Sequence, residues 1–161
     1  MKIFLDSSDI NEIRKWKNRV DGFTTNPTLM RKAGVTDYEK FCKEVLAEIG
    51  DKPVSFEVFA DEFDEMERQA RIISSWGKNV YVKIPITDTK GNLSADLIRK
   101  LHYDNIKVNI TAICSLKQFL QEGFPINGTL SIHSIFAGRI ADTGRNPIDY
   151  IKAWALPFKG K

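Results

Sequence analysis

The chain has 161 residues, and 24 lysines and arginines against 21 aspartates and glutamates give a formal net charge of +3. Hydrophobic residues make up 42% and charged residues 28%, which excludes a mainly disordered chain and leaves enough apolar side chains for a core. The apolar runs are far shorter than the ~20 residues of a membrane span. Because no block of lysines or arginines is present, nucleic-acid binding has little support. We expect one domain over residues 1–161, with no membrane or nucleic-acid partner.

The N-terminus and the cysteines indicate the cellular compartment and the state of the thiols that we expect for this protein. The segment MKIFLDSSDI reaches Asp6 before the ~7–15-residue apolar core of a signal peptide could form, which predicts a cytoplasmic protein. Cys42 and Cys114 lie far apart without a CxxC motif, and the chain has only two histidines. We therefore expect two buried free thiols rather than a disulfide or a zinc site.

Short aliphatic runs alternate with amphipathic stretches along the chain, which predicts six successive β-α units. The predicted strands cover residues 3–5, 23–26, 54–59, 80–86, 108–113 and 129–136. Capping residues or apolar stripes of three- and four-residue spacing mark the helices between them. Their starts are placed near Ser8, at a capping box of Thr36 and Glu39, and near Phe63, Ser94, Ser115 and Asn146.

The two phases of the predicted strands differ in polarity. One phase is apolar, as suits a face covered by helices, whereas the other carries polar residues: Asp6, Asn26, Glu57, Lys83, Asn109, Thr111 and Ser134. In an open sheet covered on both faces, both phases of a central strand would be apolar. The pattern therefore favours an α/β fold that forms part of a TIM barrel over an open doubly wound sheet, with the polar side chains inside the barrel.

Lys83 interrupts the apolar strand VYVKIPI, where an ammonium group is costly to bury unless it is paired or neutral. A neutral amine there could form a Schiff base with a carbonyl substrate, and the alternative is a structural ion pair with Glu57. Glu57 could also act as a general acid/base through a water held by a hydroxyl such as that of Thr111. Asp6 is either a second base or the cap of the next helix.

The segment GRIADTGRNP places Arg139 and Arg145 beside glycines and a helix start. Guanidinium and backbone N–H groups could hold a phosphate there, and the alternative is a pair of solvated surface arginines. His133 and His102 are interpreted as structural residues. The chain has no Walker loop, GxGxxG, GxSxG or HExxH motif, so nucleotide, serine-hydrolase and metalloprotease functions lose their usual support.

Six motifs in the same order resemble the transaldolase family, specifically the short transaldolases related to fructose-6-phosphate aldolase. They are FLDSSD, DGFTTNPTL, SFEV, VKIP, KVNITAI and SIFAGRIADTG, and together they cover almost the whole chain. The resemblance implies a (β/α)8 barrel of the class I aldolase type that works without a metal or an organic cofactor. It also implies homo-oligomers and sugar phosphate substrates.

The resemblance further implies a role for each site residue. Lys83 would form the Schiff base with the ketose donor, and Asp6 would handle the proton during carbon–carbon cleavage. Glu57 with Thr111 would move protons through a catalytic water. The implied substrate-binding residues are Asn26, Asn109 and Ser134 for the hydroxyls of the dihydroxyacetone unit, Arg139 for the sugar phosphate, and Thr25 and Phe136.

Two positions separate the activities within this family. Glu57 and Phe136 resemble the transaldolases, whereas fructose-6-phosphate aldolases are similar to one another in having Gln and Tyr there. The resemblance therefore implies transfer of a dihydroxyacetone unit from sedoheptulose 7-phosphate or fructose 6-phosphate to an aldose phosphate, in the pentose phosphate pathway. The alternatives are an aldolase that releases free dihydroxyacetone and a non-catalytic remnant that binds sugar phosphates or assembles with full-length subunits.

A complete barrel needs eight strands and about 200 residues or more. Because this sequence stops at LPFKGK, we expect the last two units of the barrel to be absent from it, with the phosphate-binding Ser and Arg groups of the family's seventh strand. An incomplete record, a second chain that covers the gap or a shortened gene product would each account for this. We favour incompleteness or truncation.

Overall fold

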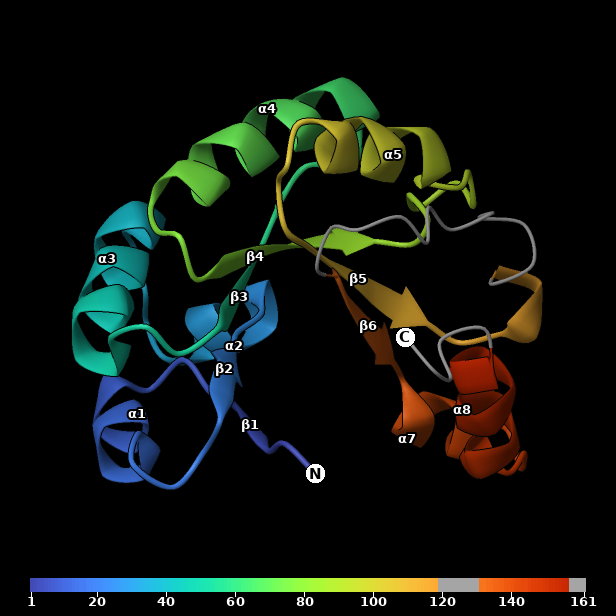
Figure 1. Ribbon diagram of the computed structural model, residues 1–161, viewed down its shortest axis with the longest axis horizontal. Helices are drawn as coiled ribbons and strands as arrows, with labels where there is room; N and C mark the ends of the chain where they lie inside the picture. The colour runs from blue at the N-terminus through green and yellow to red at the C-terminus, as the bar shows by residue number, and fades with distance from the viewer. Residues whose placement is uncertain (119–130, 157–161) are drawn as a thin grey trace.

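A curled sheet of six parallel strands forms the centre of the computed structural model, which describes residues 1–118 and 131–156 (Figure 1). The strands pair in chain order: β1 (Phe4–Asp6), β2 (Gly22–Thr24), β3 (Val54–Glu57), β4 (Val80–Pro85), β5 (Val108–Ile113) and β6 (Ser131–Ile135). The sheet curves into a half-barrel with β1 and β6 at its edges, so the expected α/β fold and partial TIM barrel are confirmed. Residues 129–130 of the sixth predicted strand lie outside the described residues.

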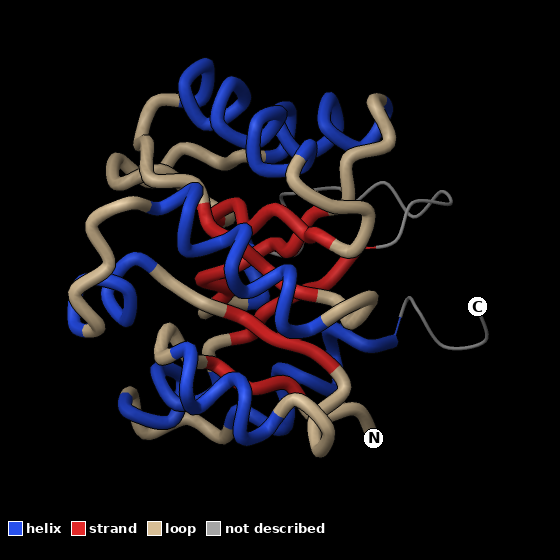
Figure 2. The backbone as a smooth tube through the Cα atoms, turned by 90° about the vertical axis from the view of Figure 1, so that its left-hand side faces the viewer, coloured by secondary structure: helices blue, strands red, loops and turns tan. Residues whose placement is uncertain are grey.

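Helices follow the strands, and α3, α4 and α5 cover the convex face of the sheet (Figures 1 and 2). They are α1 (Ile10–Trp16), α2 (Pro27–Lys32), α3 (Tyr38–Ile49), α4 (Phe63–Ser75), α5 (Ala95–Tyr103), α7 (Ala137–Asp142) and α8 (Pro147–Ala155). Residues 116–118 are also helical, and the Gln118 amide donates to Ser115 Oγ over 3.3 Å, as expected of a cap. None of the helices in the described ranges is long and apolar enough to cross a membrane.

The apolar phase of the strands forms the core against these helices. Phe56, Val82 and Ile84 are fully buried in one cluster with Met66 of α4 and Leu101 of α5. Complete burial of a side chain of this kind contributes about 1.5–3 kcal/mol to the free energy of unfolding. Because successive strand residues point to opposite faces, this packing turns the other phase towards the concave side of the half-barrel.

The helix α3 begins one residue later than the sequence suggested. Its N-cap is Asp37, whose Oδ1 accepts a hydrogen bond from the Lys40 amide over 3.0 Å, so the predicted capping box of Thr36 and Glu39 is wrong. Asp is a stronger N-cap than Thr, and its negative charge interacts favourably with the helix dipole. The short helix α2 was not expected, and Asn26 caps it through Oδ1, which accepts from the Leu29 amide over 2.9 Å.

The two thiols lie in different environments. Cys42 is buried in α3, as expected, but the expected burial of Cys114 is wrong. Cys114 directly follows β5, where the chain leaves the sheet and its side chain no longer packs under a helix.

The cap assignment can be tested by two neighbouring substitutions. Asp37→Ala should lower the free energy of unfolding by about 1 kcal/mol, because the Lys40 amide loses its acceptor. Thr36→Ala should change it by less than about 0.5 kcal/mol, as is usual for an exposed side chain without such a contact. Urea unfolding followed by circular dichroism measures both values, and a larger loss for Thr36→Ala would contradict the assignment.

Candidate active site

A row of polar side chains crosses the concave face of the half-barrel. Glu57 at the end of β3 pairs in register with Lys83 of β4, and Lys83 pairs with Asn109 of β5. Residues paired in register on neighbouring strands point to the same face of a sheet. Since the residues before Glu57 and Lys83 pack under the helices, these three side chains point into the concave side.

Lys83 is the buried cation of this row. Its side chain is 8% exposed, and its Nζ lies 3.2 Å from Glu57 Oε2. The same nitrogen donates to the backbone carbonyl of Thr25 over 3.0 Å. A buried ammonium group is tolerated only when such partners offset the loss of hydration. The ion pair with Glu57 therefore exists, and it holds a lysine amine at a fixed position in the site.

Two carboxyl groups lie close to this amine. Asp6 at the end of β1 accepts a hydrogen bond from Asn26 Nδ2 over 3.4 Å. Burial raises the pKa of Asp6, against the charge of Lys83 and the hydrogen bond from Asn26, which lower it. Burial also raises the pKa of Glu57; Lys83 opposes this effect and the negative charge of Asp6 adds to it. Both carboxyl groups thus retain protons to higher pH than exposed ones, which suits general acid–base chemistry.

Asp6 does not cap the following helix. The N-cap of α1 is Asp9, whose Oδ1 accepts from the Asn11 amide over 2.8 Å. The capping alternative for Asp6 is therefore wrong, and its carboxyl group accepts a hydrogen bond from Asn26 instead.

A hydrogen-bonded chain fixes the amide of Asn109 at both ends. Its Nδ2 donates to Ser55 Oγ over 2.9 Å, and its Oδ1 accepts from the Ser134 hydroxyl over 2.7 Å. These two hydrogen bonds link β3, β5 and β6 across the concave face, so three strands together determine the orientation of the Asn109 amide.

Two threonine hydroxyls in the site are buried without a hydrogen-bond partner in the described structure. Thr25 is 0% and Thr111 is 2% exposed, and Oγ1 of each lacks a partner. Buried polar groups are normally hydrogen-bonded. Thr111 lines the cavity described below, so its hydroxyl can bond to a ligand there, whereas Thr25 is not among the cavity residues. Beside Thr111, the residue Ala112 has a positive φ of 61°, where the pairing of β5 with β6 shifts register. Such bulges redirect side chains at the rims of barrels.

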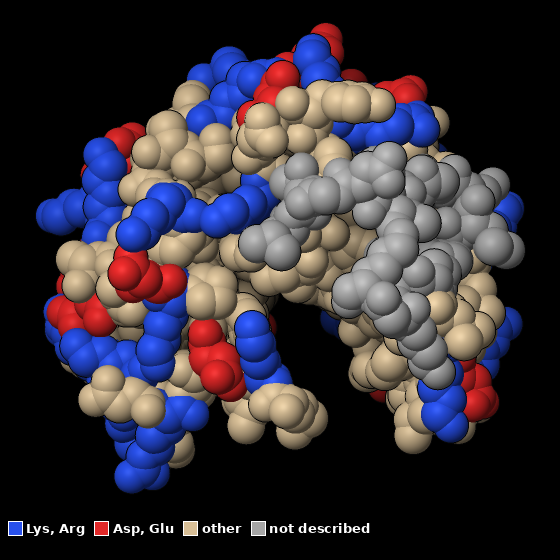
Figure 3. Space-filling model, in the orientation of Figure 1, with Lys and Arg blue, Asp and Glu red and all other residues tan. Residues whose placement is uncertain are grey.

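These groups surround a cavity of about 860 Å³, within the range of about 300–1,000 Å³ usual for ligand sites. The concave side opens between the two ends of the half-barrel (Figure 3). The predicted site residues that line the cavity are Asp6, Asn26, Glu57, Lys83, Thr111, Ser134, Phe136 and Arg139. Thr25 and Asn109 are buried and contact this set through hydrogen bonds. Within residues 1–118 and 131–156, no three His, Cys, Asp or Glu side chains cluster as metal ligands would.

Arg145 lies outside the cavity lining, and His133 borders the cavity with its ring engaged elsewhere. Arg139 borders the cavity, whereas Arg145 lies beyond α7 and donates from its Nη1 to the Tyr150 hydroxyl over 3.2 Å. His133 Nδ1 accepts from the indole of Trp154 on α8 over 2.9 Å, and burial lowers the pKa of His133 to about 4. The expectation of a structural histidine agrees with this packing.

Ser55 and Tyr38 form hydrogen bonds to site residues but were not identified from the sequence. Ser55 supports Asn109, and its place two residues before Glu57 on the same strand phase could have revealed it. Tyr38 of α3 donates from its hydroxyl to the backbone carbonyl of Glu57 over 2.8 Å. Nothing local marked Tyr38, because its position on the apolar stripe of α3 is typical of a core residue.

Comparison with known proteins assigns the chain to a family. Residues 3–156 match the model of the family described as Transaldolase/Fructose-6-phosphate aldolase. The chain belongs to this family. It is 37% identical over 148 residues to a "Probable transaldolase" of Dehalococcoides mccartyi and 41% identical over 155 residues to one of Thermoplasma volcanium. It is also 38% identical over 154 residues to "Probable transaldolase 2" of Listeria monocytogenes.

The alignments with these three relatives cover 91%, 94% and 94% of this chain. They cover 65%, 66% and 66% of the relatives. The chain thus spans about two thirds of the length of the curated relatives that it matches.

The electrostatic coupling within the site can be measured directly. Lys83→Met should raise the pKa of Glu57 and of Asp6 further, because each carboxyl group loses the positive charge that opposes its burial. Carboxyl-detected NMR titration of protein labelled with ¹³C at Asp and Glu measures these values. The surface residue Glu65, whose hydrogen bond from Arg68 lowers its pKa to about 2, is the internal control and should not move.

The same shifts determine how stability depends on pH. Since Asp6 and Glu57 bind protons more tightly in the folded than in the unfolded chain, their ionisation lowers the free energy of unfolding as pH rises above the ordinary carboxyl pKa. This loss should be larger in Lys83→Met. An unchanged pKa for both carboxyl groups in that variant would contradict the coupling.

Proposed function

We propose that this chain carries the Schiff-base site of a transaldolase, which transfers a dihydroxyacetone unit from a ketose phosphate to an aldose phosphate. The donor is sedoheptulose 7-phosphate or fructose 6-phosphate. The observation that carries the proposal is Lys83, a buried lysine amine on the wall of a cavity beside two carboxyl groups of raised pKa. Membership of the Transaldolase/Fructose-6-phosphate aldolase family and the names of the relatives support it.

The first step is attack of the Lys83 amine on the C2 carbonyl of the ketose. Lys83 must lose a proton before it attacks, and Glu57, 3.2 Å away, is placed to take that proton. Glu57 then returns it to the carbinolamine oxygen, which leaves as water while the C=N bond forms. The raised pKa of Glu57 suits a group that both accepts and donates a proton.

The second step breaks the bond between C3 and C4. Asp6 takes the proton of the C4 hydroxyl, the C4–O bond becomes a carbonyl, and the electrons of the C3–C4 bond move into the protonated imine. The aldose phosphate leaves, and an enamine of dihydroxyacetone remains on Lys83. An incoming aldose phosphate reacts by the reverse sequence, and hydrolysis of the new imine releases the product.

The remaining residues bind and orient the substrate. Asn26, Asn109 and Ser134 bind hydroxyls of the dihydroxyacetone unit, while Thr111 holds the water through which Glu57 exchanges protons. Arg139 at the edge of the cavity binds the phosphate. The carbonyl of Thr25 keeps the Lys83 amine in place before the ketose arrives.

Phe136 favours transfer over release. Free dihydroxyacetone forms only when the enamine carbon is protonated, and a phenyl ring at the cavity wall donates no proton. The enamine therefore persists until an aldehyde acceptor reaches it. A second candidate function, an aldolase that releases free dihydroxyacetone, would require another proton donor in the same position.

Covalent trapping tests the central step. Incubation of the 161-residue chain with fructose 6-phosphate and borohydride should add a reduced dihydroxyacetone unit, and peptide mass spectrometry should place it on Lys83. Lys83→Met should abolish the adduct. The matched control is Lys78→Met, which removes an exposed lysine paired with Asp51 and should leave the adduct intact. No adduct in the folded wild-type chain, or an adduct that survives Lys83→Met, would contradict the proposal.

The role of Phe136 can be tested separately. Phe136→Tyr introduces a hydroxyl beside the enamine and should increase the rate at which free dihydroxyacetone forms without an acceptor, on the order of tenfold or more. Enzymatic detection of dihydroxyacetone measures this rate, and Phe63→Tyr on α4, which lies outside the cavity lining, serves as the control. Equal release by wild type and Phe136→Tyr would show that Phe136 does not decide between the two activities.

A further inference from the structure

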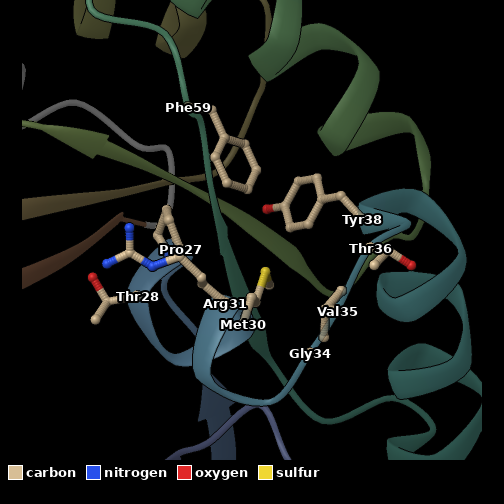
Figure 4. A pocket seen from close by; sticks show the side chains of 9 residues that line it. All are labelled: Pro27, Thr28, Met30, Arg31, Gly34, Val35, Thr36, Tyr38 and Phe59. Carbon is tan, nitrogen blue, oxygen red and sulfur yellow. The ribbon is translucent and has the colours of Figure 1, made fainter.

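A second pocket lies next to the active-site cavity, between α2 and α3 (Figure 4). Its volume is about 670 Å³, again within the range of about 300–1,000 Å³ typical of ligand sites. We call it the Arg31 pocket. Its lining residues are Pro27, Thr28, Met30, Arg31, Gly34, Val35, Thr36, Tyr38 and Phe59. Of these lining residues, only Pro27 and Thr28 fall within a motif that carried the resemblance to the transaldolase family, namely DGFTTNPTL.

Arg31 carries the only charged side chain of this lining. Its guanidinium has no hydrogen-bond or ion-pair partner in the part of the chain that the structure describes, whereas Arg14, Arg68, Arg71 and Arg99 each pair with a carboxylate. In Figure 4 the guanidinium lies beside Pro27 and Thr28. A planar guanidinium that faces a pocket without a carboxylate is suited to bidentate binding of a phosphate, and the Thr28 hydroxyl can add a hydrogen bond.

The opposite walls of the pocket are aromatic and aliphatic. Phe59 is 53% exposed, a high value for so large an apolar side chain, and its ring packs edge-on against Tyr38 with 4.6 Å between the ring centroids. Met30 and Val35 complete the apolar lining. An exposed aromatic face offers contact to the C–H surface of a small polar ligand, while the cation opposite binds its charged end.

From this arrangement we infer that the Arg31 pocket is a second binding site for a sugar phosphate. Arg31 binds the phosphate, Thr28 donates to it, and the Phe59 ring covers the carbon skeleton. The proposal goes beyond the chemistry at Lys83, because binding here needs no carbonyl group in the ligand and no covalent step.

The two pockets are contiguous. Pro27 and Thr28 line both, so these two residues form the wall between them. Tyr38, whose ring lines the Arg31 pocket, donates from its hydroxyl to the backbone carbonyl of Glu57. A sugar phosphate in the Arg31 pocket therefore lies one side chain from Glu57, and it is separated from the active-site cavity only by Pro27 and Thr28.

Methionine methyl groups provide a direct test. The chain has three methionines, and Met30 lines the Arg31 pocket while Met66 is buried in α4. The probe is glucitol 6-phosphate, a sugar phosphate that lacks a carbonyl group and cannot form a Schiff base. In protein labelled with ¹³C at the methionine methyl groups, titration with this probe should shift the Met30 signal in a saturable manner and shift Met66 far less.

Two substitutions that each remove a positive charge from α2 distinguish binding in the Arg31 pocket from a general effect of the charge on this helix. Arg31→Leu should weaken binding, measured by the Met30 shift, by about tenfold or more, because the charged hydrogen bonds to the phosphate are lost. Lys32→Leu removes the same charge one residue later, outside the pocket lining, and should leave the dissociation constant within about twofold. Equal weakening by both substitutions, or no saturable shift of Met30 in the wild type, would overturn the proposal.

The outcome is independent of the Schiff-base chemistry. Lys83→Met should bind the probe at the Arg31 pocket as the wild type does, and loss of the Met30 response in that variant would overturn the proposal. An adduct on Lys83 without a Met30 response would refute the second site alone. A Met30 response in a wild-type chain that forms no adduct would refute the transaldolase proposal alone.

Discussion

The charge on Lys83 is the constraint on which the rest of the site depends. An ammonium group that is 8% exposed loses most of its hydration, so it requires partners at fixed distances. Glu57 and the Thr25 carbonyl provide them. These partners come from β3 and from the segment after β2, so three neighbouring strands must be in the correct register before the lysine can be buried. Stability and the position of the Lys83 amine therefore rest on the same contacts.

Several side chains serve the fold and the site together. Asn26 caps α2 through Oδ1 and donates from Nδ2 to Asp6, so the start of a helix orients a carboxyl group of the site. Asn109 is fixed in the same way, since Ser55 and Ser134 bind opposite ends of its amide. Because these amides are held by backbone and side-chain contacts, their orientation is fixed before any ligand binds.

The helix α2 separates two pockets of different charge. The cavity on the concave side contains both carboxylates and cations, whereas the Arg31 pocket contains one unpaired guanidinium and an aromatic wall. Pro27 and Thr28 face both spaces, and Tyr38 connects the second pocket to Glu57. The helix thus places an additional positive charge next to the site where we propose that phosphorylated sugars react.

The alternation of polar and apolar residues in the strands determined the fold and most of the site. A two-residue period shows from the sequence alone that Glu57, Lys83 and Asn109 share a face opposite the helices. It does not show which atoms meet. The ion pair of Lys83, the cap at Asp37, the exposure of Cys114 and the contact between Tyr38 and Glu57 depend on distances between segments far apart in the chain or on small differences in backbone path. Only the tertiary structure decides such distances, because local patterns specify the direction of a side chain but not its neighbour.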